Sequence, residues 1–248
     1  MTSNIRFENP SDGLNNWPNR KGIWSEIIKN NKVTILCTQE GRKNQLLDAN
    51  SCINLDLIHG HREWIPERMY PCIFIDKNIF TLIESGDFWL SETPHVAGSK
   101  SFQSAFPRLC TWVLLKKDEF SFYVFCCHLD HILDSTRHEQ SKVLSEQITK
   151  INSQSLPFVL AGDFNESPNG NVRSHIDKNL ILKDPVALND ENNQGTHHRF
   201  DGDNTKTSRI DWILHTEKFK SSDYRIIKDS KNGIYPSDHF PVVTRLTI

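Results

Sequence analysis

The chain has 248 residues, of which 37% are hydrophobic and 24% are charged, and its formal net charge at pH 7 is -2. A chain of this size can bury one sizeable core, so we expect a single domain spanning residues 1–248. The small negative charge excludes the global positive field that drives non-specific nucleic-acid binding, but it does not exclude a local basic groove.

The chain opens with MTSNIRF, which lacks the basic stretch, apolar core and small-residue cleavage site of a secretory signal. We therefore expect a cytoplasmic protein, although a leader that had already been removed would leave the same pattern. No segment is long and apolar enough to indicate a membrane anchor, and no obligate protein partner is evident.

Short apolar runs rich in β-branched and aromatic residues recur along the chain, each with the length of a strand. Two segments instead carry apolar side chains at helical spacing. Because strands and helices alternate, and several strands are apolar on both faces, helices should cover the sheets. In chain order, the predicted elements are a helix at 20–31, strands at 33–39, 70–76, 109–115 and 120–129, a helix at 135–152, and strands at 156–164, 209–215 and 240–248.

A polar segment rich in Asn, Asp and Gly, residues 189–208, is typical of a long surface loop. Loops of this length inside a compact domain are usually functional. We expect substrate selectivity to reside in this loop and around Trp64 and Trp89.

Six cysteines are spread along the chain without the paired spacing of a metal site. Most lie inside apolar runs such as VTILCT and FYVFCC. We expect them to be small buried hydrophobic side chains of a protein in a reducing compartment. They are Cys37, Cys52, Cys72, Cys110, Cys126 and Cys127.

Five predicted strands end in acidic, amide or imidazole side chains. In VLAGDFNESPNG, Asp163 and Asn165 are two residues apart on extended chain, so they point to the same side. Turn chemistry explains any one such ending, but the recurrence favours a common site that holds a metal or a water nucleophile. Asp211 lies between apolar neighbours and needs a partner, because a buried unpaired charge is costly. His239 is the natural partner.

Read together, these motifs resemble the endonuclease/exonuclease/phosphatase superfamily, which includes deoxyribonuclease I. The resemblance runs through CTQE, SGDFWLSETP, FPRLCTW, HLDH, GDFN, RIDWIL and SDHFPV, in the family's order. The N-terminal stretch and FWLSETP are most similar to a bacterial subgroup whose members are mostly of unassigned substrate. The resemblance implies a four-layer α/β sandwich, with two face-to-face mixed β-sheets flanked by helices.

The resemblance also implies a divalent cation. Asn4, Glu40 and Asp238 match the positions that face it. Because the ligands are mostly oxygen atoms, a hard cation is favoured over zinc. Magnesium is the default, and manganese or calcium are the alternatives.

Five further residues match catalytic positions of the family. Asp163 is expected to orient or deprotonate the attacking water, and Asn165 to hold the phosphate or that water. His239 is expected to contact the scissile phosphate, with Asp211 fixing its other nitrogen. His128 matches a second histidine that binds a phosphate oxygen or protonates the leaving group.

Three residues match substrate or phosphate-binding positions of the family less closely. Arg108 in FPRLCTW and His198 in GTHHRF resemble flanking residues of the subgroup's site. Glu67 is close to a family glutamate that precedes the strand at 70–76, but its register is shifted by one or two residues.

These expectations describe a metal-dependent phosphoesterase in which an activated water attacks in line. Such a reaction needs charge neutralised on a phosphate oxygen and a stabilised leaving oxygen. Basic residues are scattered rather than clustered, so a small phosphoester is as plausible a substrate as nucleic acid. The expected bond is either a diester, as in nucleases, or a monoester.

Two alternatives compete with this interpretation. The run Cys126-x-His128-x-Asp130-His131 is one residue away from the H-x-H-x-D-H motif of metallo-β-lactamase-like zinc hydrolases, but that interpretation leaves GDFN, RIDWIL and SDHFPV unexplained. We expect Asp130 and His131 to be turn or supporting residues. An inactive binding module on the same fold would be expected to lack a metal-binding or water-positioning residue, and none is lacking.

Overall fold

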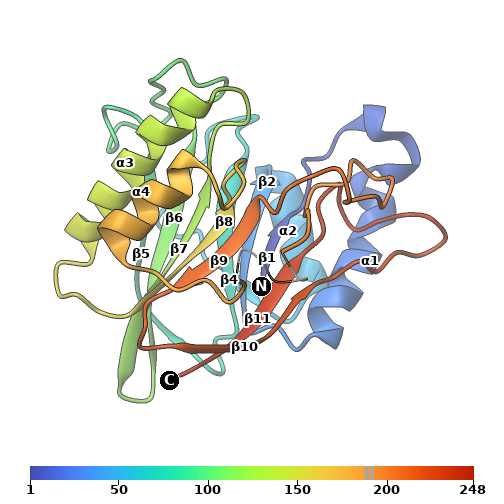
Figure 1. Cartoon of the computed structure of the whole chain (residues 1–248). Coiled ribbons are helices and arrows are strands. Elements are labelled where there is room, and N and C mark those ends of the chain that lie inside the picture. The colour runs from blue at the N-terminus through green and yellow to red at the C-terminus, as the bar shows by residue number, and fades with distance from the viewer. Residues whose placement is uncertain (188–189, 191–192) are drawn as a thin grey trace.

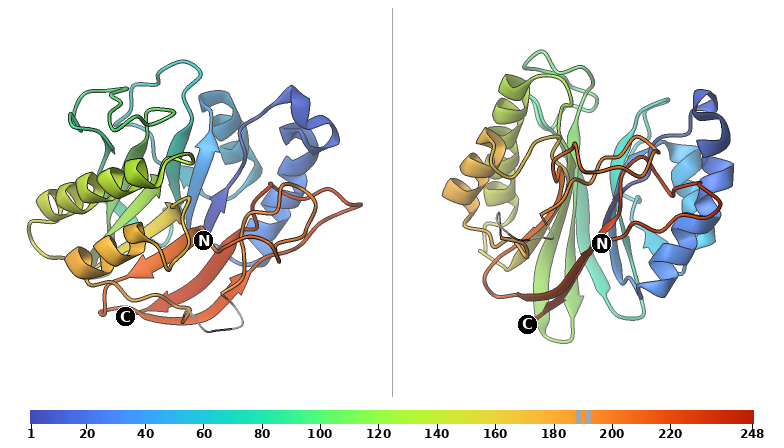
Figure 2. Two further views of the ribbon diagram at one scale, coloured as in Figure 1. Left: turned by 45° about the horizontal axis from the view of Figure 1, so that its top comes forward. Right: turned by 45° about the vertical axis from the view of Figure 1, so that its right-hand side comes forward.

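Two β-sheets packed face to face form the centre of the protein, and helices cover both outer faces (Figure 1). The computed structural model describes residues 1–187, 190 and 193–248. The two sheets and the helices on their outer faces confirm the predicted four-layer α/β sandwich. On one outer face lie α1 (Trp17–Asn30) and α2 (Lys43–Cys52), and on the other lie α3 (Asp134–Ile151) and α4 (Asn171–Leu180) (Figure 2).

Both sheets are mixed, since each contains one parallel pair among antiparallel ones. A 3-10 helix, Pro10–Asn15, precedes α1. In spatial order, the six-stranded sheet is β10 (Lys220–Ile226), β11 (Val242–Thr247), β1 (Thr2–Asn4), β2 (Ile35–Gly41), β4 (Tyr70–Ile75) and β3 (Asp56–Leu57). The five-stranded sheet is β5 (Thr81–Trp89), β6 (Leu109–Lys117), β7 (Phe120–His128), β8 (Phe158–Asp163) and β9 (Asp211–His215).

Apolar side chains fill three layers, one between the sheets and one beneath each pair of helices. Val124 and Ile213 lie between the sheets, whereas Leu144 of α3 packs with Trp212 on the outer face of the five-stranded sheet. Because β4 and β8 are covered on both faces, every residue of these strands is buried. This burial on both faces explains why their sequences are continuous apolar runs.

Several elements are absent from the sequence-based prediction, and their burial explains why. Edge strands β5 and β10 alternate between exposed and half-buried residues over most of their length, so they show no apolar run. Helix α4 buries only Val172 and Ile176, and α2 buries few apolar side chains, so neither has a clear amphipathic pattern. Residues 189, 191 and 192 of the predicted loop at 189–208 lie outside the described residues. The described part of this loop contains no strand or helix.

The register of the five-stranded sheet brings three polar residues side by side. His128 at the end of β7 pairs with Asp163 at the end of β8, which pairs with Asp211 at the start of β9. A Cβ atom on Gly162 would collide with the backbone oxygen of Cys127, and its φ of +149° also disfavours a side chain, so glycine is needed beside Asp163.

A cleft of about 890 Å³ lies at the opposite end of the sandwich from these strand tips. It is lined by the beginnings of β2 and β8 and by the end of β11, with apolar residues such as Phe122 and Phe219 on its wall. Strand β1, which separates β2 from β11, has only three residues. None of the polar strand-tip residues lines this cleft.

All six cysteines are free thiols, and five of them are buried, as predicted for small apolar side chains. Among the described residues, no helix has the length and apolar character needed to span a lipid bilayer.

Candidate active site

Asp163 is the centre of a buried polar cluster where the strand tips of the two sheets meet. Its side chain is 1% exposed. Oδ1 accepts the backbone N–H of Asn165 at 2.9 Å, and Oδ2 accepts Nδ2 of Asn4 at 3.0 Å. The same Oδ2 lies 3.5 Å from Nε2 of His128 and 3.9 Å from Nε2 of His239. One carboxylate oxygen therefore faces an amide and two imidazoles.

Burial, together with the negative charge of Asp211, raises the pKa of Asp163 to about 7. A carboxyl group with a pKa near neutrality can accept a proton at physiological pH, which is what a general base requires. The cluster therefore holds an acid whose protonation can change during a reaction.

Asp211 and His239 form the buried pair that the sequence predicts. Nδ1 of His239 donates to Oδ2 of Asp211 at 2.9 Å. Burial opposes the charged imidazole, but the carboxylates of Asp211, Asp163 and Asp238 outweigh it and raise the pKa of His239 well above its usual value. Oδ1 of Asp211 is buried without a hydrogen-bond partner in the described part of the chain. Because Nδ1 of His239 is bonded to Asp211, its Nε2 faces Asp163 at the centre of the cluster.

Arg108 supplies a buried positive charge beside His128. Its Nη1 donates to Nδ1 of His128 at 2.9 Å, and Nη2 donates to Nδ1 of His131 at 3.2 Å. Burial and the Arg108 charge lower the pKa of His128 well below its usual value, so the imidazole is neutral. Arg108 is 6% exposed, its Nε has no partner, and no described carboxylate lies within ion-pair distance of it. The guanidinium therefore lacks a direct anionic partner.

Asn4 and Glu40 contribute from the six-stranded sheet. Nδ2 of Asn4 donates to Oε1 of Glu40 at 3.1 Å, while its Oδ1 accepts the backbone N–H of Arg6 at 3.0 Å. The amide nitrogen, not the oxygen, thus faces the carboxylates. Glu40 has a φ of +69°, which is uncommon for a non-glycine residue and marks a locally strained strand end.

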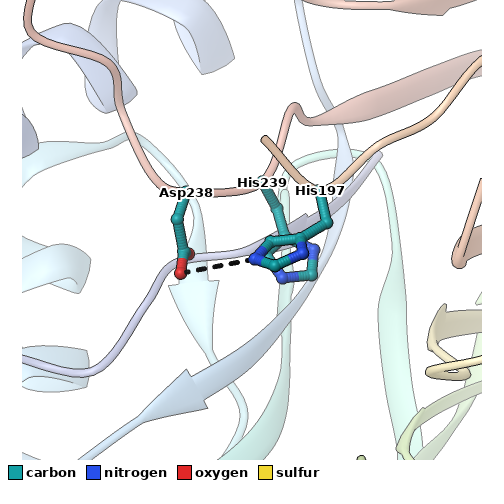
Figure 3. A group of neighbouring side chains, drawn as sticks. All are labelled: His197, Asp238 and His239. Atoms are coloured by element: carbon teal, nitrogen blue, oxygen red, sulfur yellow. Dashed lines mark ion pairs between the residues drawn. The ribbon is translucent and has the colours of Figure 1, made fainter. Parts of the chain in front are cut away.

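Asp238 and His197 complete the cluster on the side of β11. His197 lies 4.0 Å, through Nε2, from Oδ2 of Asp238, and its ring is 4.7 Å from the ring of His239 (Figure 3). Asp238 Oδ1 accepts the hydroxyl of Ser237 at 3.2 Å. His197 is not among the predicted site residues, and only its place beside His198 in the THH run could have indicated it.

Two predicted site residues lie outside this cluster. His198 is 1% exposed and stacks on Phe240 at 3.8 Å, and burial lowers its pKa to about 4. Glu67 has an 83% exposed side chain that pairs with Arg42 at 3.3 Å. Asn165 lies at the edge of the cluster, where its Nδ2 donates to the backbone of the β7 exit.

The supporting roles expected for Asp130 and His131 agree with their contacts. Asp130 is buried, and its oxygens accept the backbone N–H groups of Ala105, Ile132 and Leu133 and the hydroxyl of Ser104. These bonds use both oxygens, so Asp130 fixes the turn before α3. The zinc-hydrolase alternative needs Asp130 as a metal ligand, and the described groups able to hold a metal do not contain it.

The carboxylate and imidazole atoms of the cluster are close enough to hold metal ions. The described residues include two such groups, in each of which the potential ligand atoms lie within 4.8 Å of one another. One group is Asp163, Asp211 and His239, and the other is His197, Asp238 and His239.

The sequence matches the model of the endonuclease/exonuclease/phosphatase family over residues 1–239. The structure is similar to a mannosyl-6-phosphatase from Bacteroides thetaiotaomicron, with 30% identity, 100% of this chain and 98% of that chain covered, and a TM-score of 0.89. A functionally unknown conserved protein from Enterococcus faecalis is 27% identical, with 99% and 98% covered and a TM-score of 0.88. TDP2 from D. rerio, complexed with single-strand DNA product, is 15% identical, with 100% and 97% covered and a TM-score of 0.79, which shows a common fold alone. The search of curated proteins found no match.

Proposed function

Because the chain belongs to the endonuclease/exonuclease/phosphatase family, we propose that it is a divalent-metal-dependent phosphoesterase. The observation that carries this proposal is that one buried cluster contains both a cation without an ion-pair partner among the described residues and a carboxyl group able to accept a proton. Arg108 is a buried cation whose hydrogen bonds go to the imidazoles of His128 and His131 rather than to a carboxylate, and Asp163 is a buried acid with a raised pKa. A phosphoryl group and an attacking water supply the anion and the proton that these two groups lack.

In this proposal, Asp163 accepts the proton of the attacking water. Asn4 donates to its Oδ2, and the imidazoles of His128 and His239 face the same oxygen at 3.5 and 3.9 Å, from where they would contact the oxygens of a bound phosphoryl group. His239, kept protonated by Asp211, offers an N–H and a positive charge on one side. Neutral His128 and cationic Arg108 lie on the other side. These groups stabilise the negative charge that develops as the bond to the leaving oxygen breaks.

The carboxylates of the cluster are the donor type that a hard divalent cation prefers, with magnesium as the default, and the described groups compact enough to hold an ion contain Asp238 but not Glu40. Glu40 would hold it, with support from Asp238, because carboxylate oxygens are the ligands such cations prefer. Asn4 could add its oxygen only if its carboxamide turned over, since Nδ2 now faces the carboxylates. When bound, the cation neutralises charge on a phosphoryl oxygen and favours ionisation of a bound water.

A small phosphomonoester, such as a sugar phosphate, is the substrate class we propose first. Two arginines on the surface around the cluster, unlike the buried Arg108, are paired with carboxylates. Arg6 pairs with Asp12 at 3.1 Å, and Arg42 pairs with Glu67 at 3.3 Å. Because their charges are paired, these arginines do not form the continuous positive groove that binds a nucleic-acid backbone. Similarity to a mannosyl-6-phosphatase over the whole chain supports the same class.

Single-stranded nucleic acid is the second candidate, because one surface feature favours it. The guanidinium groups of Arg6 and Arg42 lie 4.4 and 4.8 Å from the centre of the Phe7 ring, beside Glu40. An aromatic ring flanked by cations is the kind of platform on which nucleobases stack. This platform would bind the leaving group of a phosphodiester.

The test compares wild type with Asp163→Asn on mannose 6-phosphate, p-nitrophenyl phosphate, bis-p-nitrophenyl phosphate and single-stranded DNA and RNA, with and without magnesium. We expect magnesium-dependent phosphate release from the monoesters that Asp163→Asn abolishes. Asp56→Asn, an exposed surface carboxylate paired with Lys77, serves as the matched control and should retain activity. Cleavage of diesters alone would select the second candidate. Absence of hydrolysis by the folded, magnesium-loaded protein would contradict both.

A further inference from the structure

A group of two imidazoles and one carboxylate lies at the edge of the proposed active site. It consists of His197, from the segment before β9, and of Asp238 and His239, from the segment before β11 (Figure 3). Their potential ligand atoms lie within 4.8 Å of one another. None of the roles proposed above uses His197.

The imidazole of His239 is oriented as in a metal ligand. Its Nδ1 is held by Asp211 at 2.9 Å, which fixes the ring and directs Nε2 away from that carboxylate. A histidine whose second nitrogen is held by a carboxylate is the usual arrangement around protein-bound zinc. Asp211 therefore supports His239 without being a ligand of this group itself.

The backbone holds the two segments in register. The N–H of Phe240 donates to the carbonyl of Thr196 at 2.7 Å, and the N–H of His198 donates to the carbonyl of Asp238 at 2.8 Å. His197 and His239 face each other across this bridge. The packing of His198 on Phe240 fixes the same junction. The three side chains thus project from a rigid frame, as a metal site requires.

The donor set differs in chemistry from that of Glu40 and Asn4. Two nitrogen donors and one carboxylate suit zinc, cobalt or manganese, whereas magnesium and calcium prefer oxygen donors alone. Zinc–nitrogen bonds of about 2.0–2.1 Å require the ligand atoms to approach more closely than they do here. Rotation of His197, whose side chain is 29% exposed, can supply that approach.

Positive side chains near this group oppose a bound cation. Arg20 and Arg199 act on it electrostatically without an ion pair, and Arg6 approaches Asp238. Arg6 Nε lies 4.0 Å from Oδ2 of Asp238. Its guanidinium, however, donates two hydrogen bonds to Asp12, at 3.2 and 3.1 Å, so its charge is already paired. Asp238 therefore retains an oxygen that can face His197.

We propose that His197, Asp238 and His239 form a transition-metal site that binds a zinc-type ion. This site shares Asp238 with the hard-cation site at Glu40 but differs from it in ligand preference. An ion bound there displaces the proton on Nε2 of His239 into solvent and occupies that nitrogen, so the group no longer donates to the phosphoryl oxygen. Zinc should consequently inhibit magnesium-supported hydrolysis. This regulatory consequence rests on the proposed function, whereas the metal site itself does not.

Cobalt is the probe for the site, because its visible absorption reports nitrogen ligation and coordination number without any substrate. Metal-free wild type, His197→Phe and the control His95→Phe, which removes an exposed histidine, are titrated with cobalt in excess magnesium. We expect wild type and His95→Phe to develop the absorption of a four- or five-coordinate nitrogen-ligated ion, and His197→Phe to bind at least tenfold more weakly. His197→Gln repeats the test if His197→Phe does not fold.

Equal cobalt affinity in wild type and both His197 variants would overturn the proposal, as would displacement of cobalt by magnesium at equal concentration. Zinc inhibition is measured separately on whichever substrate is hydrolysed, and His197→Phe should require at least tenfold more zinc for half-inhibition. Because cobalt absorption needs no turnover, loss of the metal site and absence of phosphoesterase activity give different results.

Discussion

Two of the buried clusters of charge among the described residues differ in how their carboxylates are compensated. In the first, Asp87 of β5 accepts Nε and Nη2 of Arg62, each at 2.7 Å, and the hydroxyl of Thr111 at 2.7 Å. His61 lies 3.3 Å away. Although burial alone would raise the pKa of Asp87, these partners lower it well below its usual value. The charge is fully compensated.

In the second cluster, compensation is incomplete. Oδ1 of Asp211 has no partner, Arg108 has no carboxylate, and the pKa of Asp163 is raised to about 7. Buried polar groups in native proteins are normally satisfied. The first cluster is therefore complete without any ligand, whereas the second is the one that metal and substrate would complete under the proposed function. Unpaired charge, rather than buried charge as such, indicates the functional site.

The largest expected contrast is between Arg62 and Arg108, one buried arginine from each cluster. Arg108→Met should lower kcat/KM by roughly 10²- to 10³-fold, as loss of a transition-state donor does, and leave the unfolding free energy unchanged. Arg62→Met should instead cost about 3–5 kcal/mol of stability, because it leaves Asp87 buried without its cation. Urea unfolding and steady-state kinetics on both variants measure these effects. A stability loss in Arg108→Met equal to that in Arg62→Met would erase the distinction.

The next contrast concerns how the stability contributed by Asp87 depends on pH. Because the folded-state pKa of Asp87 is depressed, its stabilisation is present above the unfolded value near 4 and is lost as the pH falls below that value. Asp87→Asn should therefore be less stable than wild type at pH 7 by about 3 kcal/mol, and the gap should narrow by pH 3. Chemical unfolding at both pH values gives this difference. A gap that stayed constant with pH would show that the carboxylate charge is not the cause.

Asp163 should show the opposite pH dependence in the metal-free protein. Its folded-state pKa of about 7 lies above the unfolded value, so the folded state holds its proton longer and loses stability as pH rises from about 4 to about 7. Relative to Asp163→Asn, wild type should lose several degrees of unfolding midpoint between pH 5 and pH 8. Magnesium at pH 8 should restore part of this loss. Parallel midpoint curves for the two proteins would contradict the raised pKa.

The smallest expected effect is at Glu67. Its exposed pairing with Arg42 is worth at most about 1 kcal/mol, and its side chain does not reach the cluster. Glu67→Gln should therefore change kcat/KM by less than about threefold, within what a surface charge near a site contributes. A larger fall in kcat/KM would show that Glu67 reaches the substrate.

Much of the fold could be predicted because the central strands are buried on both faces. The runs that became β2, β4, β6, β7, β8, β9 and β11 carry continuous apolar patterns. The edge strands β5 and β10 could not be recognised, since half of their surface meets solvent and their stability comes from pairing with β6 and β11. Pairing partners are a property of the tertiary fold and leave no local pattern.

The strand-tip residues were predictable for a related reason. A carboxylate such as Asp211 inside an apolar strand is costly without a partner, so its sequence context already indicates a contact such as the one with His239. The two adjacent histidines of GTHHRF could not be told apart in the same way. Only the backbone bridge to β11 turns His197 toward His239 and His198 toward Phe240.

The central claim is tested most directly by measuring magnesium-dependent phosphomonoester hydrolysis and unfolding free energy in Asp163→Asn and Asp87→Asn together. Asp163→Asn should lose roughly 10³-fold in rate, as removal of a general base does, and be as stable as wild type or more so. Asp87→Asn should keep its rate per folded molecule and lose stability. If both variants lost stability and neither lost rate selectively, unpaired charge would not mark the functional site.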